Sequence, residues 1–231
     1  MSGTFHGVGL GPGAADLLTL RAARLIEGAE VIAYPSLAGG DSLARAIVAD
    51  LIPARAEEVR IDVPMTRDRA PAQAAYDAGA ARIAAHLDAG RDVVCLCEGD
   101  PLFYGSFMYL MARLRDRFPI ETVPGVTSMT ACAAAAAMPL AARDETVTIL
   151  PGTLPDDALR ARLRDTDSAV VMKVGRHAGR LRDLIRAEGL DGAYVERATT
   201  GAERVLPLAE APDAGPYFST ILVTKGADPW L

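Results

Sequence analysis

Short apolar stretches alternate with longer amphipathic runs over the first half of the chain, and this order limits the fold more than any other feature. Stretches with strand character lie at residues 4–10, 30–34, 57–63, 92–97 and 120–123. The runs between them space their apolar residues as a helix does, for example Leu17, Leu18, Ala22, Leu25 and Ile26. For this first helix, Asp16 is the expected N-cap and Gly28 the expected C-terminal stop. Such alternation predicts a mostly parallel sheet with helices on both faces.

The second half of the chain follows a different order. An Ala-rich helix is expected over residues 124–138, and two further helices over 155–165 and 177–189. Strands are expected at 145–150, 168–174, 192–198, 203–208 and 217–226. Since few helices separate the later strands, this half should form a mixed or antiparallel sheet. We therefore predict two α/β domains, residues 1–123 and 124–231.

Composition narrows the class of protein. Half of the 231 residues are hydrophobic, which argues against disorder, and the net charge of −6 argues against a nucleic-acid partner. The longest apolar run, residues 131–142, is shorter than the ~20 residues of a membrane span, and no export signal precedes the first strand. We therefore expect a cytoplasmic protein without a membrane partner. Its three cysteines are an odd number, which argues against a disulfide framework.

The stretch GVGLGPG, residues 7–13, follows the first expected strand. It differs from a dinucleotide-binding loop because Pro12 and Ala14 stand where the third glycine is needed, and no acidic residue closes the second strand. Pro12 also lacks an N–H group that a phosphate could accept. The loop therefore suits close approach by a less anionic ligand, although a plain strand-to-helix turn remains open.

Two more motifs follow expected strands. CEGDPLFYGS spans residues 97–106, and VPGVTS spans residues 123–128. Ligands of open α/β sheets bind at the carboxyl ends of the strands. Asp100 could accept a hydrogen bond there or cap the next helix, and Thr127 and Ser128 could do either as well.

Together, and in this order, the three motifs resemble the tetrapyrrole (corrin/porphyrin) methyltransferase family over almost the whole chain. The resemblance implies two α/β domains with S-adenosyl-L-methionine in the cleft between them, S-adenosyl-L-homocysteine as the spent cofactor, and a homodimer. The stretches GDPLFYGSFMYL, ETVTILPGTL and VVMKVGRH look most like members that methylate carbon 20 of precorrin-2, giving precorrin-3A, in cobalamin biosynthesis. Methylation of another corrin-ring carbon or of cobalt-precorrin-2, and a non-catalytic tetrapyrrole-binding protein, are the alternatives.

The resemblance also implies which residues contact the cofactor. By motif position these are Pro12, Glu98, Gly99, Asp100, Phe103, Thr127, Ser128, Val174 and Ala198. Two of them depart from the family pattern, because Glu98 replaces a glycine and Val174 stands where methionine is common.

An acidic chain must hold a polycarboxylated tetrapyrrole with local positive charge. Arg67 and Arg69 lie where the family has a flap over the cleft, and are expected to clamp substrate carboxylates unless they are ordinary solvated loop charges. Tyr104 and Arg176 are further candidate substrate contacts. The proton acceptor is not identified, with His177 and Asp100 as candidates.

Cys95 and Cys97 point to one face of a buried strand. No Cys or His pair completes a metal-ligand spacing with them, so core packing is expected and a metal site is not.

Overall fold

The computed structural model describes residues 1–231 except 38, 65, 67 and 227–231. It divides the chain into two compact units, Met1–Thr127 and Ser128–Leu231, each described here by itself. The boundary predicted after Val123 falls at the end of the last strand of the N-terminal unit. Among the described residues, no helix combines the length and apolar character that a membrane span requires.

The N-terminal unit is built on a parallel sheet of five strands in the order β3-β2-β4-β1-β5. The strands are β1 (Phe5–Gly9), β2 (Val31–Leu37), β3 (Glu57–Val63), β4 (Val93–Cys97) and β5 (Ile120–Val123). The helices are α1 (Leu20–Gly28), α2 (Leu43–Ile47), α3 (Ala70–Asp88) and α4 (Phe107–Leu114). This arrangement confirms the predicted fold of the first half.

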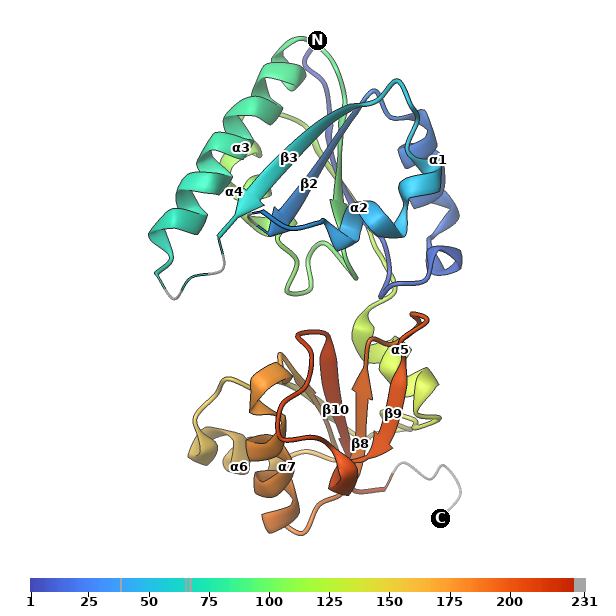
Figure 1. The fold of residues 1–231 in the computed structure, drawn as a ribbon, viewed down its shortest axis with the longest axis vertical. Helices are drawn as coiled ribbons and strands as arrows, with labels where there is room; N and C mark the ends of the chain where they lie inside the picture. The colour runs from blue at the N-terminus through green and yellow to red at the C-terminus, as the bar shows by residue number, and fades with distance from the viewer. Residues whose placement is uncertain (38, 65, 67, 227–231) are drawn as a thin grey trace. The chain divides into compact units, whose positions relative to one another are not determined.

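Helices cover both faces of the parallel sheet (Figure 1). One apolar core joins α3 and α4 to the face that carries Phe5 and Cys95, and another joins α1 and α2 to the face that carries Val8 and Leu96. Cys95 and Cys97 are both buried in the first core, on one face of β4 as the sequence predicts.

The start of α1 differs from the sequence expectation. Asp16 is a plausible N-cap by sequence, yet it lies in a separate helical turn, Ala15–Leu17, and α1 begins after Thr19. Thr19 Oγ1 accepts a hydrogen bond from Ala22 N at 3.1 Å, which satisfies a free amide of the first turn. The helix ends at Gly28, as its glycine predicts.

The C-terminal unit holds a mixed sheet in the order β6-β7-β10-β8-β9. Its strands are β6 (Val147–Pro151), β7 (Ser168–Met172), β8 (Gly192–Glu196), β9 (Arg204–Pro207) and β10 (Ser219–Thr224). β6 and β7 are parallel, whereas β10 runs antiparallel to both β7 and β8. The carboxyl ends of β7 and β8 and the start of β10 therefore share one edge of the sheet.

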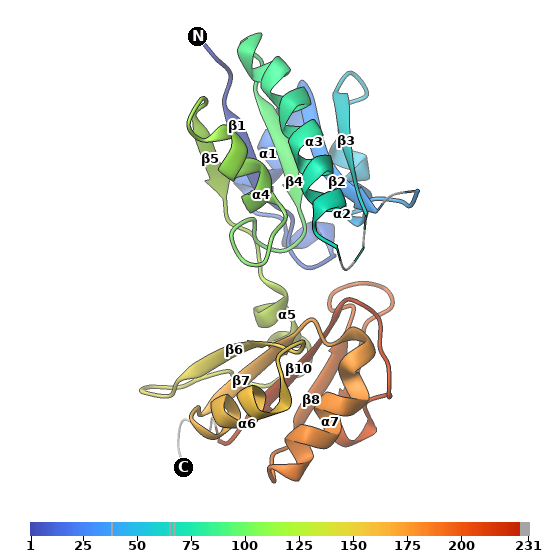
Figure 2. The ribbon, with the colours of Figure 1, turned by 90° about the vertical axis from the view of Figure 1, so that its left-hand side faces the viewer.

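Three helices complete the C-terminal unit: α5 (Ser128–Ala135), α6 (Asp156–Arg164) and α7 (Ala178–Ala187). Leucines of α6 and α7 pack on the sheet in a single core. Figure 2 shows the two helices next to each other in front of this sheet. The α5 helix lies against β10. The mixed sheet predicted for this half is confirmed.

Candidate functional site

The first two sequence motifs are joined at the carboxyl edge of the parallel sheet. Gly99 N donates to Gly11 O at 2.7 Å, and Gly11 N donates to Gly99 O at 3.3 Å. Because Gly11 lies in the loop after β1 and Gly99 in the loop after β4, this bridge sets both loops side by side.

The third motif is packed against that bridge. A Cβ atom built on Gly9 would lie 2.5 Å from Gly125 N and 2.8 Å from Gly99 O. A Cβ atom on Gly125 would lie 2.9 Å from Gly9 Cα and would overlap Gly99 O. Three backbones thus meet at this point, and Gly9 and Gly125 must be glycine because a side chain at either position would overlap the neighbouring backbone.

Asp100 holds two of these three loops together. Its Oδ1 accepts from Leu102 N at 2.9 Å, and its Oδ2 accepts from Gly125 N at 3.1 Å. The alternative that Asp100 caps the next helix is wrong, since α4 begins only at Phe107. Asp100 instead fixes its own turn and the loop after β5.

The backbone of the loop after β4 is uncovered at Gly99. Gly99 has a φ of 66°, and a Cβ atom built there would meet nothing within 4 Å. Pro12 and Phe103 are partly buried, and the Phe103 ring lies edge-on to Tyr104 with centroids 5.1 Å apart. Tyr104 is half exposed with a φ of 57°. Open backbone flanked by apolar side chains suits the face of a small organic ligand.

Glu98 plays a role that the motif alignment does not reveal. Its Oε1 accepts from Ala44 N at 3.1 Å, in the first turn of α2. Burial raises the pKa of the Glu98 carboxyl above its usual value. The side chain that replaces the family's glycine therefore anchors α2 to the end of β4.

Glu98→Gln tests this assignment. Because burial favours the protonated acid in the fold, the native protein binds more protons than the unfolded chain, and the Glu98 contribution to stability falls as pH rises through its folded pKa. Gln keeps an oxygen for Ala44 N without the charge. Thermal unfolding at pH 7 should occur at a higher temperature in the variant than in the parent protein, and the difference should shrink toward pH 4.

Glu27→Gln, at an exposed position of α1, is the matched control and should show no such difference. A Glu98→Gln protein less stable than the parent at pH 7 would show that the charge itself is needed.

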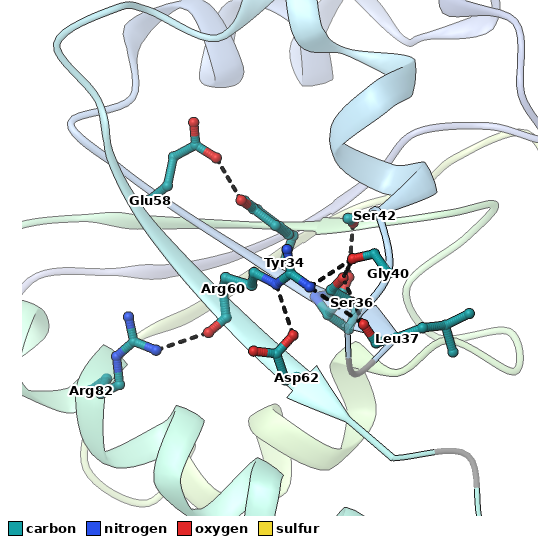
Figure 3. Close-up of polar contacts among 10 residues, drawn as sticks. Tyr34, Ser36, Leu37, Gly40, Ser42, Glu58, Arg60, Asp62 and Arg82 are labelled. Atoms are coloured by element: carbon teal, nitrogen blue, oxygen red, sulfur yellow. Dashed lines mark hydrogen bonds and ion pairs between the residues drawn. The ribbon is translucent and has the colours of Figure 1, made fainter.

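The loop between β2 and α2 is fixed at the same edge of the sheet (Figure 3). Arg60 Nη2 donates to Gly40 O at 2.6 Å, while its Nε donates to Asp62 Oδ1 at 2.7 Å. Ser36 Oγ donates to the same Gly40 oxygen at 3.0 Å. This loop is thus fastened from β3 and from its own strand, next to the helix that Glu98 anchors.

In the C-terminal unit the predicted residues follow β7 and β8. Val174 is fully buried and Ala198 is 6% exposed. The backbone around them is strained, because Lys173, Arg197 and Thr199 have φ values of 58°, 46° and 69°, in the left-handed region that favours glycine. Strain of this kind clusters at functional sites.

Buried polar groups lie beneath these loops, and the sequence analysis missed them. Tyr194 Oη donates to Glu196 Oε1 at 2.9 Å, and Arg204 lies 3.4 Å from Glu196 Oε2. Ser219 Oγ accepts from Gly175 N at 3.1 Å and so ties β10 to the loop after β7. Burial raises the pKa of Tyr194 to about 12, so its hydroxyl stays a donor. The one feature of the sequence that could have indicated these groups is Glu196, a glutamate at the end of an otherwise apolar strand.

The remaining predicted residues are spread over both units. Thr127 ends the N-terminal unit and Ser128 begins α5, directly after the loop of Gly125. Arg69 is exposed just before α3, while Arg67 lies outside the described residues. Arg176 is exposed in the loop after β7.

His177, the other candidate proton acceptor, is half-buried. Burial, with the nearby charges of Arg180 and Arg176, lowers the pKa of its imidazole, which keeps the ring neutral at pH 7. Among the described residues no group of His, Cys, Asp and Glu side chains is arranged to hold a metal ion.

A family model described as Tetrapyrrole (Corrin/Porphyrin) Methylases matches residues 4–212 of the chain. The chain is 44% identical to a Precorrin-2 C(20)-methyltransferase of Sinorhizobium sp., over 98% of this chain and 97% of that protein. It is 46% identical to the Cobalamin biosynthesis protein CobIJ of Mycobacterium bovis, over 97% of this chain. The chain spans only 46% of the length of that CobIJ protein.

A solved structure gives a further likeness. The chain matches a uroporphyrin-III C-methyl transferase from Thermus thermophilus, complexed with S-adenosyl homocysteine, at 28% identity and a TM-score of 0.70. The match covers 95% of this chain and 97% of that one.

Proposed function

The chain belongs to the tetrapyrrole (corrin/porphyrin) methylase family, and from this we propose that it transfers a methyl group from S-adenosyl-L-methionine to carbon 20 of precorrin-2. The observation that carries the proposal is the junction of Gly9, Gly99 and Gly125, which unites all three motifs of the N-terminal unit. The likeness to the Sinorhizobium enzyme, over nearly the full length of both chains, supports the substrate.

The residues at the junction fit the proposed cofactor. The space over Gly99 leaves room for a flat or folded ligand, and Asp100 fixes the backbone beside it. We assign Pro12, Gly99, Asp100 and Phe103 to the cofactor site from this unit, with Thr127 and Ser128 beside them. From the C-terminal unit we assign Val174 and Ala198. The Glu98 side chain serves α2, so only its backbone is assigned to the site.

When bound, S-adenosyl-L-methionine supplies an electrophilic methyl group on a sulfonium. The chain then has little covalent chemistry to perform, and its contribution is to place the two reactants in line in a dry site, which can be worth an effective molarity of about 10⁵ M or more. A neutral His177 can accept a proton, and it stays a candidate for the base beside Asp100. Arg67 and Arg69 remain proposed clamps for substrate carboxylates, and Tyr104 a proposed substrate contact.

Other parts of the proposal rest on the family alone. A homodimer and a cytoplasmic location remain predictions. Size-exclusion chromatography with light scattering tests the first, because a dimer has twice the mass of the 24.3 kDa chain.

Two measurements test the function. Calorimetry should show one S-adenosyl-L-methionine bound per chain, and incubation with precorrin-2 should give a product heavier by one methyl group. Absence of cofactor binding would contradict every enzymatic alternative. Binding of cofactor and precorrin-2 without a mass change would leave the non-catalytic tetrapyrrole-binding protein as the explanation, and methylation of only the cobalt-loaded substrate would favour cobalt-precorrin-2.

A further inference from the structure

We propose that three adjacent loops of the C-terminal unit, residues 173–176, 197–199 and 216–218, form a surface that binds the carboxylates and the conjugated face of the macrocycle. The inference rests on the proposed function, which requires a polycarboxylated tetrapyrrole, and it adds contacts that the motifs do not assign. Beside Arg176, these are Arg197 and the aromatic pair Tyr217 and Phe218.

Backbone contacts hold the three loops together. Arg197 N donates to Phe218 O at 2.8 Å, and Gly215 N donates to Gly175 O at 3.0 Å. A Cβ atom on Gly175 would lie 3.9 Å from Tyr217 Cα. Arg176, Arg197 and the aromatic pair therefore stand on neighbouring segments at one edge of the mixed sheet.

The two guanidinium groups differ from most others in this unit. Arg160 and Arg164 pair with Glu188, and Arg182 pairs with Asp213. Arg176 and Arg197 are exposed, and no described carboxylate pairs with either of them. Among the described residues, the Arg176 side chain contacts His177, with its Nε 3.5 Å from His177 Nε2. In a chain of net charge −6, two exposed arginines on neighbouring segments, neither paired with a described carboxylate, are suited to an acidic ligand.

The conformation of Arg197 supports a binding role. Its φ of 46° lies where glycine would be unstrained. The Arg197 N–H bond to Phe218 and the buried Glu196 beside it hold the backbone in place. A strained position that carries a long cationic side chain, rather than glycine, indicates that the guanidinium is used.

The aromatic pair supplies the apolar part of the surface. Tyr217 is 62% exposed and Phe218 is 46% exposed, with ring centroids 5.0 Å apart in an edge-to-face arrangement. Exposed rings beside free guanidinium groups match a ligand that is both conjugated and anionic. An apolar protein partner would match the rings but would leave both arginines unpaired.

Fluorescence titration with uroporphyrin, a stable polycarboxylated tetrapyrrole, tests the surface without turnover. Arg176→Gln and Arg197→Gln should each weaken uroporphyrin binding about tenfold, the size of one charge-assisted hydrogen bond, and the double variant should weaken it further. Tyr217→Ala and Phe218→Ala should each weaken it about fivefold. Affinity for S-adenosyl-L-methionine should change less than about twofold in the arginine variants, within the range of surface substitutions.

Two controls separate binding from folding. Arg186→Gln removes an exposed arginine from the last turn of α7 and should leave uroporphyrin affinity unchanged. Arg197→Gly relieves the left-handed strain, so it should weaken uroporphyrin binding as Arg197→Gln does while the midpoint of thermal unfolding holds or rises.

The proposal is overturned if the parent chain does not bind uroporphyrin, or if the arginine variants bind it as Arg186→Gln does. A failure of this proposal can be distinguished from a failure of the proposed function. If the parent methylates precorrin-2 and both arginine variants do so with the same KM, the surface alone is refuted. If the parent binds uroporphyrin through these residues but does not bind S-adenosyl-L-methionine, the methyl transfer alone is refuted.

Discussion

Gly125→Ala is expected to abolish S-adenosyl-L-methionine binding and to destabilise the N-terminal unit by about 3 kcal/mol or more, because the added methyl group would overlap backbone atoms that cannot move separately. The atoms are Gly99 O and the backbone of Gly9, which belong to the two other motif loops. Relief of the overlap would require the three loops to part, and the space over Gly99 would then change shape. Calorimetry and thermal unfolding measure the two effects.

Gly28→Ala is the matched control for that substitution. A Cβ atom on Gly28 meets nothing within 4 Å, and the residue ends α1. The control should bind cofactor like the parent and unfold at the same or a slightly higher temperature, since alanine favours a helix. Normal cofactor binding by Gly125→Ala would show that the interlocked loops are not the cofactor site.

Asp100→Ala is expected to weaken cofactor binding by more than a hundredfold and to cost about 2–4 kcal/mol of stability, because two backbone N–H groups lose their acceptor. The loops after β4 and β5 would no longer be held together by a side chain. The cofactor affinity and the stability of Asp100→Asn should lie between those of the parent protein and those of Asp100→Ala. The amide of Asn has one oxygen to accept a hydrogen bond, but it must turn its N–H₂ group toward the other backbone donor. Calorimetry with both variants measures the ranking.

Asp116→Ala is the control for Asp100→Ala. Its carboxylate is 89% exposed and lies 3.8 Å from Arg115, so its loss should change neither stability nor binding. Should Asp100→Asn bind cofactor as tightly as the parent, the two-fold acceptance by Asp100 would not be what shapes the site.

Much of the fold could be predicted because periodicity is a local property of the chain. The five apolar stretches before residue 124 became β1 to β5, and the glycine at residue 28 ended α1 as expected. The start of α1 was misplaced from Asp16 because two residues able to cap lie close together, and only the backbone decides that Thr19 takes the role.

The motifs in the sequence predicted which residues form the candidate site, but not the contacts that hold these residues in place. That Gly9 and Gly125 touch depends on β1 and β5 being neighbours, which no local pattern encodes. The capping of α2 by Glu98 joins residues 54 positions apart, and Tyr194 on β8 looks like any aromatic strand residue until Glu196 and Gly215 are placed around it. Each of these contacts arises from topology.

The central claim is that this chain methylates carbon 20 of precorrin-2, and carbon-13 NMR of the product made with methyl-labelled S-adenosyl-L-methionine tests it most directly. The account predicts a single new labelled methyl group, bonded to the meso carbon C-20. A labelled methyl on any other ring carbon, or a tetrapyrrole recovered without label, would contradict it.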